Sequence, residues 1–181
     1  MKAHSLQWKK LQCVANNEQK DNIPTGRCGH SLTFFGSTSI VLFGGMNSDG
    51  VVINDTHVLT LSNQVNTWHK VKRQEIVPKG RWKHTATKIS VSQMIIYGGL
   101  VGDESECCNE VWLFNTATNT WKCQDTSPTL FRSSHATCLI HKDAYVFGGM
   151  GGRSSKSKLY LSDLSVLSTK TWKWQTVSDK E

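Results

Sequence analysis

A short apolar run that ends in two glycines occurs three times in this chain, and it constrains the fold more than any other feature. The copies span residues 40–45, 94–99 and 144–149, and their first glycines lie 54 and 50 residues apart. A run of β-branched and aromatic residues that stops at glycine is typical of a buried strand rather than a helix. A glycine pair at the strand end allows backbone conformations and close approaches that other residues do not. The chain is therefore predicted to consist of repeats of about fifty residues.

Three further motifs recur in step with each glycine pair. Upstream, a proline is followed by an arginine and then by a histidine three residues after that arginine. Downstream come a six-residue segment (54–59, 109–114 or 161–166) and a closing Thr-Trp pair. The repeated members are Pro24, Pro78 and Pro128; Arg27, Arg81 and Arg132; His30, His84 and His135; and Trp68, Trp121 and Trp172.

This arrangement, four strands per unit with a double glycine after the second, resembles the kelch repeat, whose period is about 50 residues. The resemblance covers residues 24–178 and divides them into repeats at 24–76, 77–126 and 127–178. It implies an all-β fold: a kelch-type β-propeller arc of three four-stranded blades plus one extra N-terminal strand. A single blade cannot bury both of its faces, so neighbouring blades are expected to stack around an axis. The residues expected to serve this structure are Gly44, Gly45, Gly98, Gly99, Gly148, Gly149, Trp68, Trp121 and Trp172.

Residues 1–23 are expected to hold the closing strand of an incomplete blade, around Trp8, and a linker. The chain also finishes on a closing strand, at Trp172 and Trp174, so its two ends duplicate each other rather than complete one blade. Propellers typically have four to eight blades. We therefore expect an arc of a larger ring, from a truncated isoform, a gene fragment or a partial gene model, with self-association that completes the propeller as the alternative. The terminal blades of an isolated arc should expose apolar faces.

Composition excludes several classes of protein. No run of eighteen apolar residues is present, so no membrane span is expected. The polar start of the chain lacks the apolar core of a secretory signal, which argues against secretion. The cysteines form no CxxC pair and are expected to be reduced thiols in a cytoplasmic protein, with a nuclear location also open. The adjacent Cys107 and Cys108 keep a redox or metal role open.

Nothing in the sequence argues for catalysis. Three histidines at equivalent positions could suggest a metal or catalytic set, but residues repeated in every blade are expected to serve the blade. The motifs GxGxxG, GKS/T, GxSxG and HExxH do not occur. Asp103, Glu104 and Glu106 could hold a cation, although a solvated loop is the favoured interpretation. We predict no enzyme activity, no cofactor and no metal site.

Binding is better supported. In an up-and-down blade, the loops between strands two and three and between strand four and the next strand one share a face, and kelch proteins commonly bind partner peptides there. The basic residues expected on this face are Lys79, Arg81 and Lys83, with Lys70, Lys72 and Arg73 upstream, and Arg153, Lys156 and Lys158. Together with a formal net charge of +7, they suit the carboxylate or phosphate groups of an acidic partner. An ordinary solvated surface is the alternative.

The position two residues after each repeated arginine varies while its neighbours repeat. It is Gly29, Lys83 and Ser134 in the three units, and a binding site on a scaffold would show such variation. The repeated arginines are expected to tie loops together more than to bind ligand, but they are kept as candidates. The partner-binding candidates are Arg27, Gly29, Arg81, Lys83, Arg132, Ser134, Arg153, Lys156 and Lys158.

The sequence thus predicts a non-catalytic protein-interaction module, of the adaptor or ubiquitin-ligase substrate-receptor type. The first alternative is an accessory propeller of an enzyme whose catalytic part is missing from this chain. The second is nucleic-acid binding through the basic face. It is disfavoured because stacking aromatics should interleave with the basic residues, and Trp82 alone does so.

Overall fold

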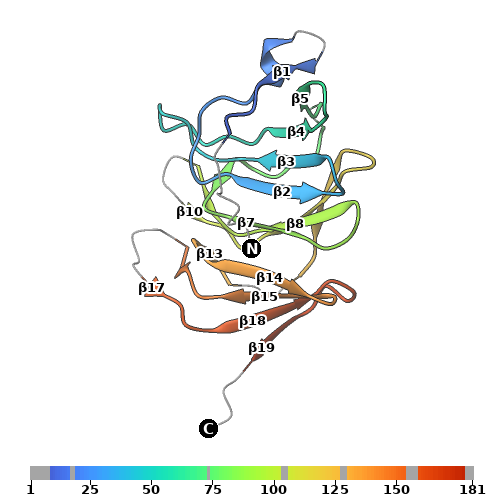
Figure 1. Cartoon of the computed structure of the whole chain (residues 1–181). Helices are drawn as coiled ribbons and strands as arrows, with labels where there is room; N and C mark the ends of the chain where they lie inside the picture. Colours follow the sequence, from blue (N-terminus) through green and yellow to red (C-terminus); the bar gives the residue numbers. More distant parts are fainter. Residues whose placement is uncertain are drawn as a thin grey trace, which may run out of the picture.

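Three main β-sheets follow one another along the chain and give an all-β structure (Figure 1). The computed structural model describes residues 9–16, 19–72, 74–102, 106–126, 130–153 and 159–177. Within these ranges the helical content is one 3-10 turn, η2 (Lys20–Asn22). No helix in the described part of the chain is long and apolar enough to cross a membrane.

Each repeat contributes a four-stranded antiparallel meander, as the sequence predicts. The strands of the first sheet are β2 (Ser31–Phe35), β3 (Ser39–Phe43), β4 (Thr56–Thr60) and β5 (Asn66–Lys70). Those of the second are β7 (Thr85–Lys88), β8 (Gln93–Tyr97), β11 (Val111–Asn115) and β12 (Thr120–Gln124). Those of the third are β14 (Ala136–Ile140), β15 (Asp143–Phe147), β18 (Leu164–Ser168) and β19 (Trp174–Val177). In every sheet the strand before the glycine pair is the second of the four.

Strand pairing resumes beyond each glycine pair, because the two glycines redirect the backbone. Gly98 and Gly99 have φ values of 64° and 99°, in the left-handed region that side chains disfavour. The strands of the two small sheets formed in this way are β6 (Arg81–Trp82), β9 (Leu100–Val101) and β10 (Glu106–Cys107), and β13 (Arg132–Ser133), β16 (Met150–Gly151) and β17 (Leu159–Tyr160). In the first repeat the same pairing is reduced to the bridges Cys28–Met46 and Met46–Val52.

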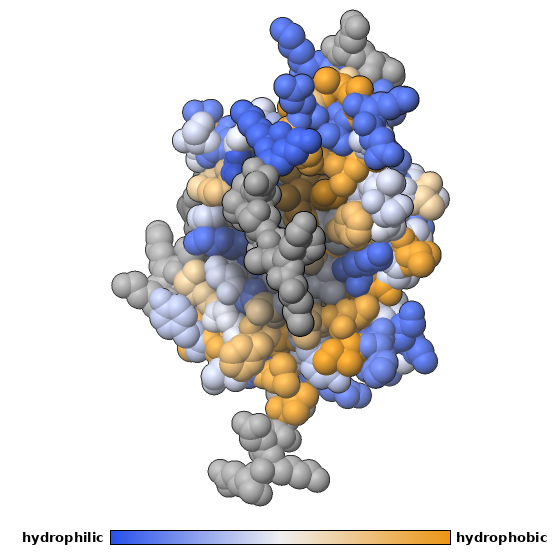
Figure 2. Space-filling view, viewed as in Figure 1, coloured by the Kyte–Doolittle hydropathy of each residue, from blue (hydrophilic) through white to orange (hydrophobic). Residues whose placement is uncertain are grey.

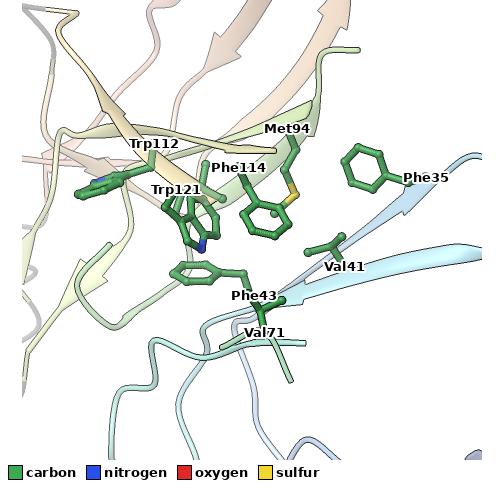
Figure 3. Close-up of a cluster of buried hydrophobic side chains, with 9 residues drawn as sticks. Phe35, Val41, Phe43, Val71, Met94, Trp112, Phe114 and Trp121 are labelled. Atoms are coloured by element: carbon green, nitrogen blue, oxygen red, sulfur yellow. The ribbon is translucent and has the colours of Figure 1, made fainter. Parts of the chain in front are cut away.

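The second sheet is buried on both faces. Met94 and Ile96 of β8 pack toward the first sheet, whereas Ile95 and Tyr97 pack toward the third. Figure 3 shows the first of these clusters, in which the Trp121 ring contacts both Phe43 and Phe114. Burial on alternating sides explains why the second strand of the repeat reads as a continuous apolar run.

The N-terminal segment contributes a strand that lies later in the chain than the one expected around Trp8. Strand β1 (Cys13–Ala15) pairs in parallel with β5 at the edge of the first sheet, where a linker was expected to begin. Residues 9–12 are not in a strand, and Trp8 lies outside the described residues. The side chain of Asn22 in η2 fixes this segment, because its carbonyl oxygen accepts a hydrogen bond from the Lys70 backbone N–H at 2.9 Å.

The closing tryptophan of the third repeat is Trp174 and not Trp172. Trp68 is paired with Leu59 and Trp121 with Phe114, and the equivalent partner in the third sheet, Leu167, is paired with Trp174. Trp172 lies in the turn before β19, at a φ of 57°, and packs against the second core cluster. In the third repeat the Thr-Trp motif thus lies two residues before the tryptophan of the closing strand. The sequence pattern alone could not reveal this shift, because the motif itself is the same as in the other two repeats.

Candidate partner-binding face

Gly29, Lys83 and Ser134 lie side by side in the structure. The Lys83 N–H donates to the Gly29 carbonyl at 2.9 Å, and the Ser134 N–H donates to the Lys83 carbonyl at 2.9 Å. These bonds run from sheet to sheet, with β7 packed between β2 and β14. The three positions that vary between repeats therefore form one continuous row, which we call the inner row.

All three residues of the inner row have the same left-handed backbone. Their φ values are 65° for Gly29, 56° for Lys83 and 54° for Ser134. Lysine and serine adopt this conformation at a cost, and it persists where surrounding structure imposes it. Here it makes the bend between β6 and β7 and between β13 and β14, and the sheet-to-sheet hydrogen bonds hold it. The Ser134 residue is exposed and Lys83 is half-buried.

The repeated arginines lie beneath this face with their side chains buried. The exposed fractions of the Arg27, Arg81 and Arg132 side chains are 3%, 0% and 1%. Their partners are the acidic residue of the same repeat and the carbonyl of the first glycine: Asp55 and Gly44 for Arg27, Glu110 and Gly98 for Arg81, and Asp163 and Gly148 for Arg132. Each arginine thus clamps the turn after the glycine pair to the start of the third strand. The arginines therefore have a structural role, as expected. Their acidic partners were not among the predicted site residues, although one occurs in each repeat.

The ion pair of the first repeat also includes a buried histidine. His57 Nε2 lies 3.0 Å from Asp55 Oδ2, and His57 Nδ1 lies 2.9 Å from the Asn22 carbonyl. Burial alone would raise the pKa of Asp55, but the hydrogen bonds from His57 and Arg27 hold it well below its usual value. The carboxylate stays ionised because its charge is shared with these donors.

The repeated histidines connect neighbouring sheets. His84 Nε2 lies 2.9 Å from the Ser31 hydroxyl, and His135 Nε2 lies 2.8 Å from the Thr85 hydroxyl. Burial, reinforced by the adjacent arginine, lowers the pKa of each ring to about 3. These neutral rings contribute to the frame through hydrogen bonds to side-chain hydroxyls of the neighbouring sheet. Within the described residues no cluster of three metal-ligating side chains is found.

Cys107 and Cys108 are buried next to the same frame. The Cys108 sulfur lies 2.9 Å from an Arg81 nitrogen, and burial raises the pKa of both thiols. A reactive cysteine needs a lowered pKa and access to solvent. The environment of this pair is therefore that of structural thiols.

Two cations on the face are held over aromatic rings. The Lys83 ammonium lies 4.2 Å from the centre of the Trp82 ring, and the Arg153 guanidinium lies 5.2 Å from that of Phe131. The Arg153 carbonyl also accepts a hydrogen bond from the Cys107 N–H at 3.0 Å, which joins the third repeat to the second. Phe131, which supports Arg153, was not among the predicted site residues.

The basic residues are divided between two hollows. Lys79 and Phe131 line a hollow of ≈ 210 Å³ between the second and third repeats. Lys70 and Lys72 line another, of ≈ 430 Å³, beside Trp121. Lys70 and Lys72, expected just upstream of Lys79, therefore do not line the same hollow as Lys79. Arg73, Lys156 and Lys158 lie outside the described residues, as do Asp103 and Glu104.

The sequence and the fold match a known family. A family model described as the KLHDC2/KLHL20/DRC7 Kelch-repeats domain matches residues 1–181. The chain belongs to the kelch-repeat family.

Relatives with similar sequences are longer than the chain. The tRNA wybutosine-synthesizing protein 4 of Candida albicans is 32% identical over 83% of the chain and 22% of its own length. Human Kelch domain-containing protein 3 is 29% identical over 95% of the chain and 46% of its own length. The chain thus spans less than half of each of these two relatives. A solved structure of YjhT superposes with a TM-score of 0.68 and 16% identity, over 87% of this chain and 53% of that one.

Proposed function

We propose that this kelch chain is a non-catalytic protein-interaction module that binds an acidic peptide segment of a partner protein. The observation that carries the proposal is the inner row, in which three variable residues are joined in one backbone ladder above buried, repeated arginines. A rigid repeated frame with variable residues on top is the arrangement expected of a binding surface.

The charged groups near the inner row favour an acidic partner. Lys83 and Arg153 are each supported by an aromatic ring, and Lys79 is exposed beside them. A side chain held in place loses less conformational freedom on binding, which favours affinity. The formal net charge of +7 would also speed the approach of an acidic segment. In this proposal the buried arginines hold the face in shape from below.

The role of such binding in a longer protein is part of the proposal. Kelch arrays that act as adaptors or ubiquitin-ligase substrate receptors would use the face in this way in the cytoplasm or the nucleus. The second candidate is an accessory domain of an enzyme. It is favoured by the likeness to the Candida albicans protein, whose name assigns it to the synthesis of wybutosine in tRNA.

Fluorescence anisotropy with a labelled glutamate-rich peptide tests the proposal. We expect Lys83→Ala and Arg153→Ala each to weaken binding roughly five- to ten-fold, the loss of about 1 to 1.4 kcal/mol. Lys170→Ala is the matched control, because Lys170 is exposed in the turn between β18 and β19, away from the glycine pairs. Equal weakening by all three substitutions would show that binding depends only on the net charge of the chain, and it would overturn the proposal. Tighter binding of a single-stranded RNA, with a steep salt dependence, would instead favour the nucleic-acid alternative.

A further inference from the structure

The two sheet-to-sheet contacts inside the chain use the same set of backbone groups. The Gly45 N–H donates to the Arg81 carbonyl at 2.9 Å, and the Gly99 N–H donates to the Arg132 carbonyl at 2.9 Å. The inner row adds a second bond at each contact. At each contact the earlier sheet provides a glycine N–H as donor and an inner-row carbonyl as acceptor. The later sheet provides an arginine carbonyl as acceptor and an inner-row N–H as donor.

The side chains at these contacts repeat as well. The aromatic residue before the first and the second glycine pair lies between the repeated histidine and the closing tryptophan of the next sheet. The ring-centroid distances are 5.5 Å for Phe43–His84, 4.8 Å for Phe43–Trp121, 5.0 Å for Tyr97–His135 and 4.9 Å for Tyr97–Trp174. The contact is thus a defined aromatic socket and not a general apolar surface.

The outer face of the third sheet presents the groups that the earlier sheet of each contact provides, and here they face no further sheet of this chain. Phe147, the equivalent of Phe43 and Tyr97, is 54% exposed. In the described part of the chain, no backbone acceptor is found for the Gly149 N–H and no backbone donor for the Ser134 carbonyl. There is also room for a neighbour, because a Cβ at Gly148 would meet only the Leu161 carbonyl, at 3.1 Å. Figure 2 shows hydrophobic residues over this sheet, in the lower part of the view.

The outer face of the first sheet presents the groups that the later sheet of each contact provides. The Arg27 carbonyl and the Gly29 N–H have no backbone partner from another sheet among the described residues. His30 and Trp68 stand at the positions of His84 and Trp121. Leu32 is 58% exposed. It is the residue of the first sheet equivalent to Ala86, which packs against the first core cluster.

We propose that two copies of this chain associate head to tail, with the third sheet of each packed on the first sheet of the other. Phe147 of one copy would enter the socket of His30 and Trp68 of the second copy. The Gly149 N–H would donate to the Arg27 carbonyl of the second copy, and the Ser134 carbonyl would accept from its Gly29 N–H. The partner is a second copy because the two outer faces complement each other group by group.

Two such contacts close a ring of two copies and six sheets, related by a two-fold axis. Six is within the range of four to eight blades that propellers use. The length also fits, because the chain superposes on 53% of the YjhT chain and two copies would correspond to about one chain of that kind. One bond of the internal contacts is not reproduced. The residue equivalent to Ser31 and Thr85 is Ala136, which offers no hydroxyl to His30 of the second copy.

Light scattering behind size exclusion, at micromolar concentration, tests the association. The wild-type chain should have twice its mass of 20.3 kDa. Phe147→Glu and Leu32→Glu should each be folded monomers, because these residues are half-exposed within one chain and the new charge would be buried in the contact. Val91→Glu is the matched control and should remain dimeric, since Val91 is 87% exposed in the turn between β7 and β8. Near-UV circular dichroism would confirm that each variant is folded.

A mixing experiment separates head-to-tail packing from other dimers. An equimolar mixture of the Phe147→Glu and Leu32→Glu variants should form a dimer, because one contact in it is intact. Hydrogen exchange should show the Gly149 amide as protected in the wild type as the Gly99 amide, and unprotected in Phe147→Glu. A monomeric wild type would overturn the proposal, as would a Leu32→Glu variant that stays dimeric or a mixture that stays monomeric.

Discussion

Gly98 lies directly under the carbonyl oxygen of Arg132, so close that a Cβ at Gly98 would be 2.3 Å from that oxygen. The equivalent glycine of the third repeat, Gly148, has the same φ of 64° but no such neighbour, and its Cβ would meet the Leu161 carbonyl at 3.1 Å. The glycine that the repeat requires is thus under two constraints inside the stack, one from its own backbone and one from the next sheet.

Substitution of these two glycines by alanine should separate the constraints. Both variants carry the left-handed strain, about 1 to 2 kcal/mol for a residue with a Cβ. Gly98→Ala should destabilise the fold by at least about 2 kcal/mol more, because the Arg132 backbone must move. Urea unfolding of both variants in the Leu32→Glu background, where association is removed, measures the difference. Equal losses of stability would show that the neighbouring carbonyl does not constrain Gly98.

Removal of a buried arginine should be costly. Arg132→Met leaves Asp163, whose side chain is 24% exposed, without its guanidinium partner and the Gly148 carbonyl without its donor. We expect a loss of roughly 3 kcal/mol or more in the free energy of unfolding, as for other broken buried pairs. The double variant Arg132→Met with Asp163→Leu should recover part of this loss. If the single and double variants unfold at the same urea concentration, the ion pair does not account for the burial of Arg132.

The free energy of unfolding should decrease as the pH is lowered, over a pH range set by the pKa values of two buried histidines. His84 and His135 have a pKa of about 3 in the folded chain against an ordinary value of 6.5, so the unfolded chain binds protons first as the pH drops below 6.5. The free energy of unfolding should therefore decrease from pH 6.5 toward pH 3, by up to about 1.4 kcal/mol per pH unit for each histidine. The lowered pKa of Asp55 acts in the same direction, but only as the pH falls below the ordinary aspartate value of 3.8.

The histidine part of this dependence can be isolated between pH 6.5 and pH 4.5. His135→Gln should flatten the plot of unfolding free energy against pH in that range. His141→Gln, at an exposed residue of the turn before β15, is the control and should leave the slope unchanged. An unchanged slope in His135→Gln would mean that other groups cause the acid sensitivity.

The fold and the candidate face were predictable to different degrees. The repeat, the strand before each glycine pair and the varying positions Gly29, Lys83 and Ser134 followed from local patterns and their spacing. The burial of Arg27, Arg81 and Arg132 did not, because an arginine in a loop is usually exposed and only its acidic partner accounts for its burial. Trp172 was assigned to the closing strand because it follows threonine, as Trp68 and Trp121 do.

The sequence by itself determined the strand pattern, the turns and the number of repeats, since these depend on the side-chain period and on glycine conformation within a few residues. Tertiary structure decided the rest. It selected Trp174 over Trp172 by pairing with Leu167, placed β1 beside β5, and aligned the three left-handed residues into one row. Each of these outcomes depends on contacts between groups far apart in the chain, where the gain from burial and hydrogen bonding outweighs local preference.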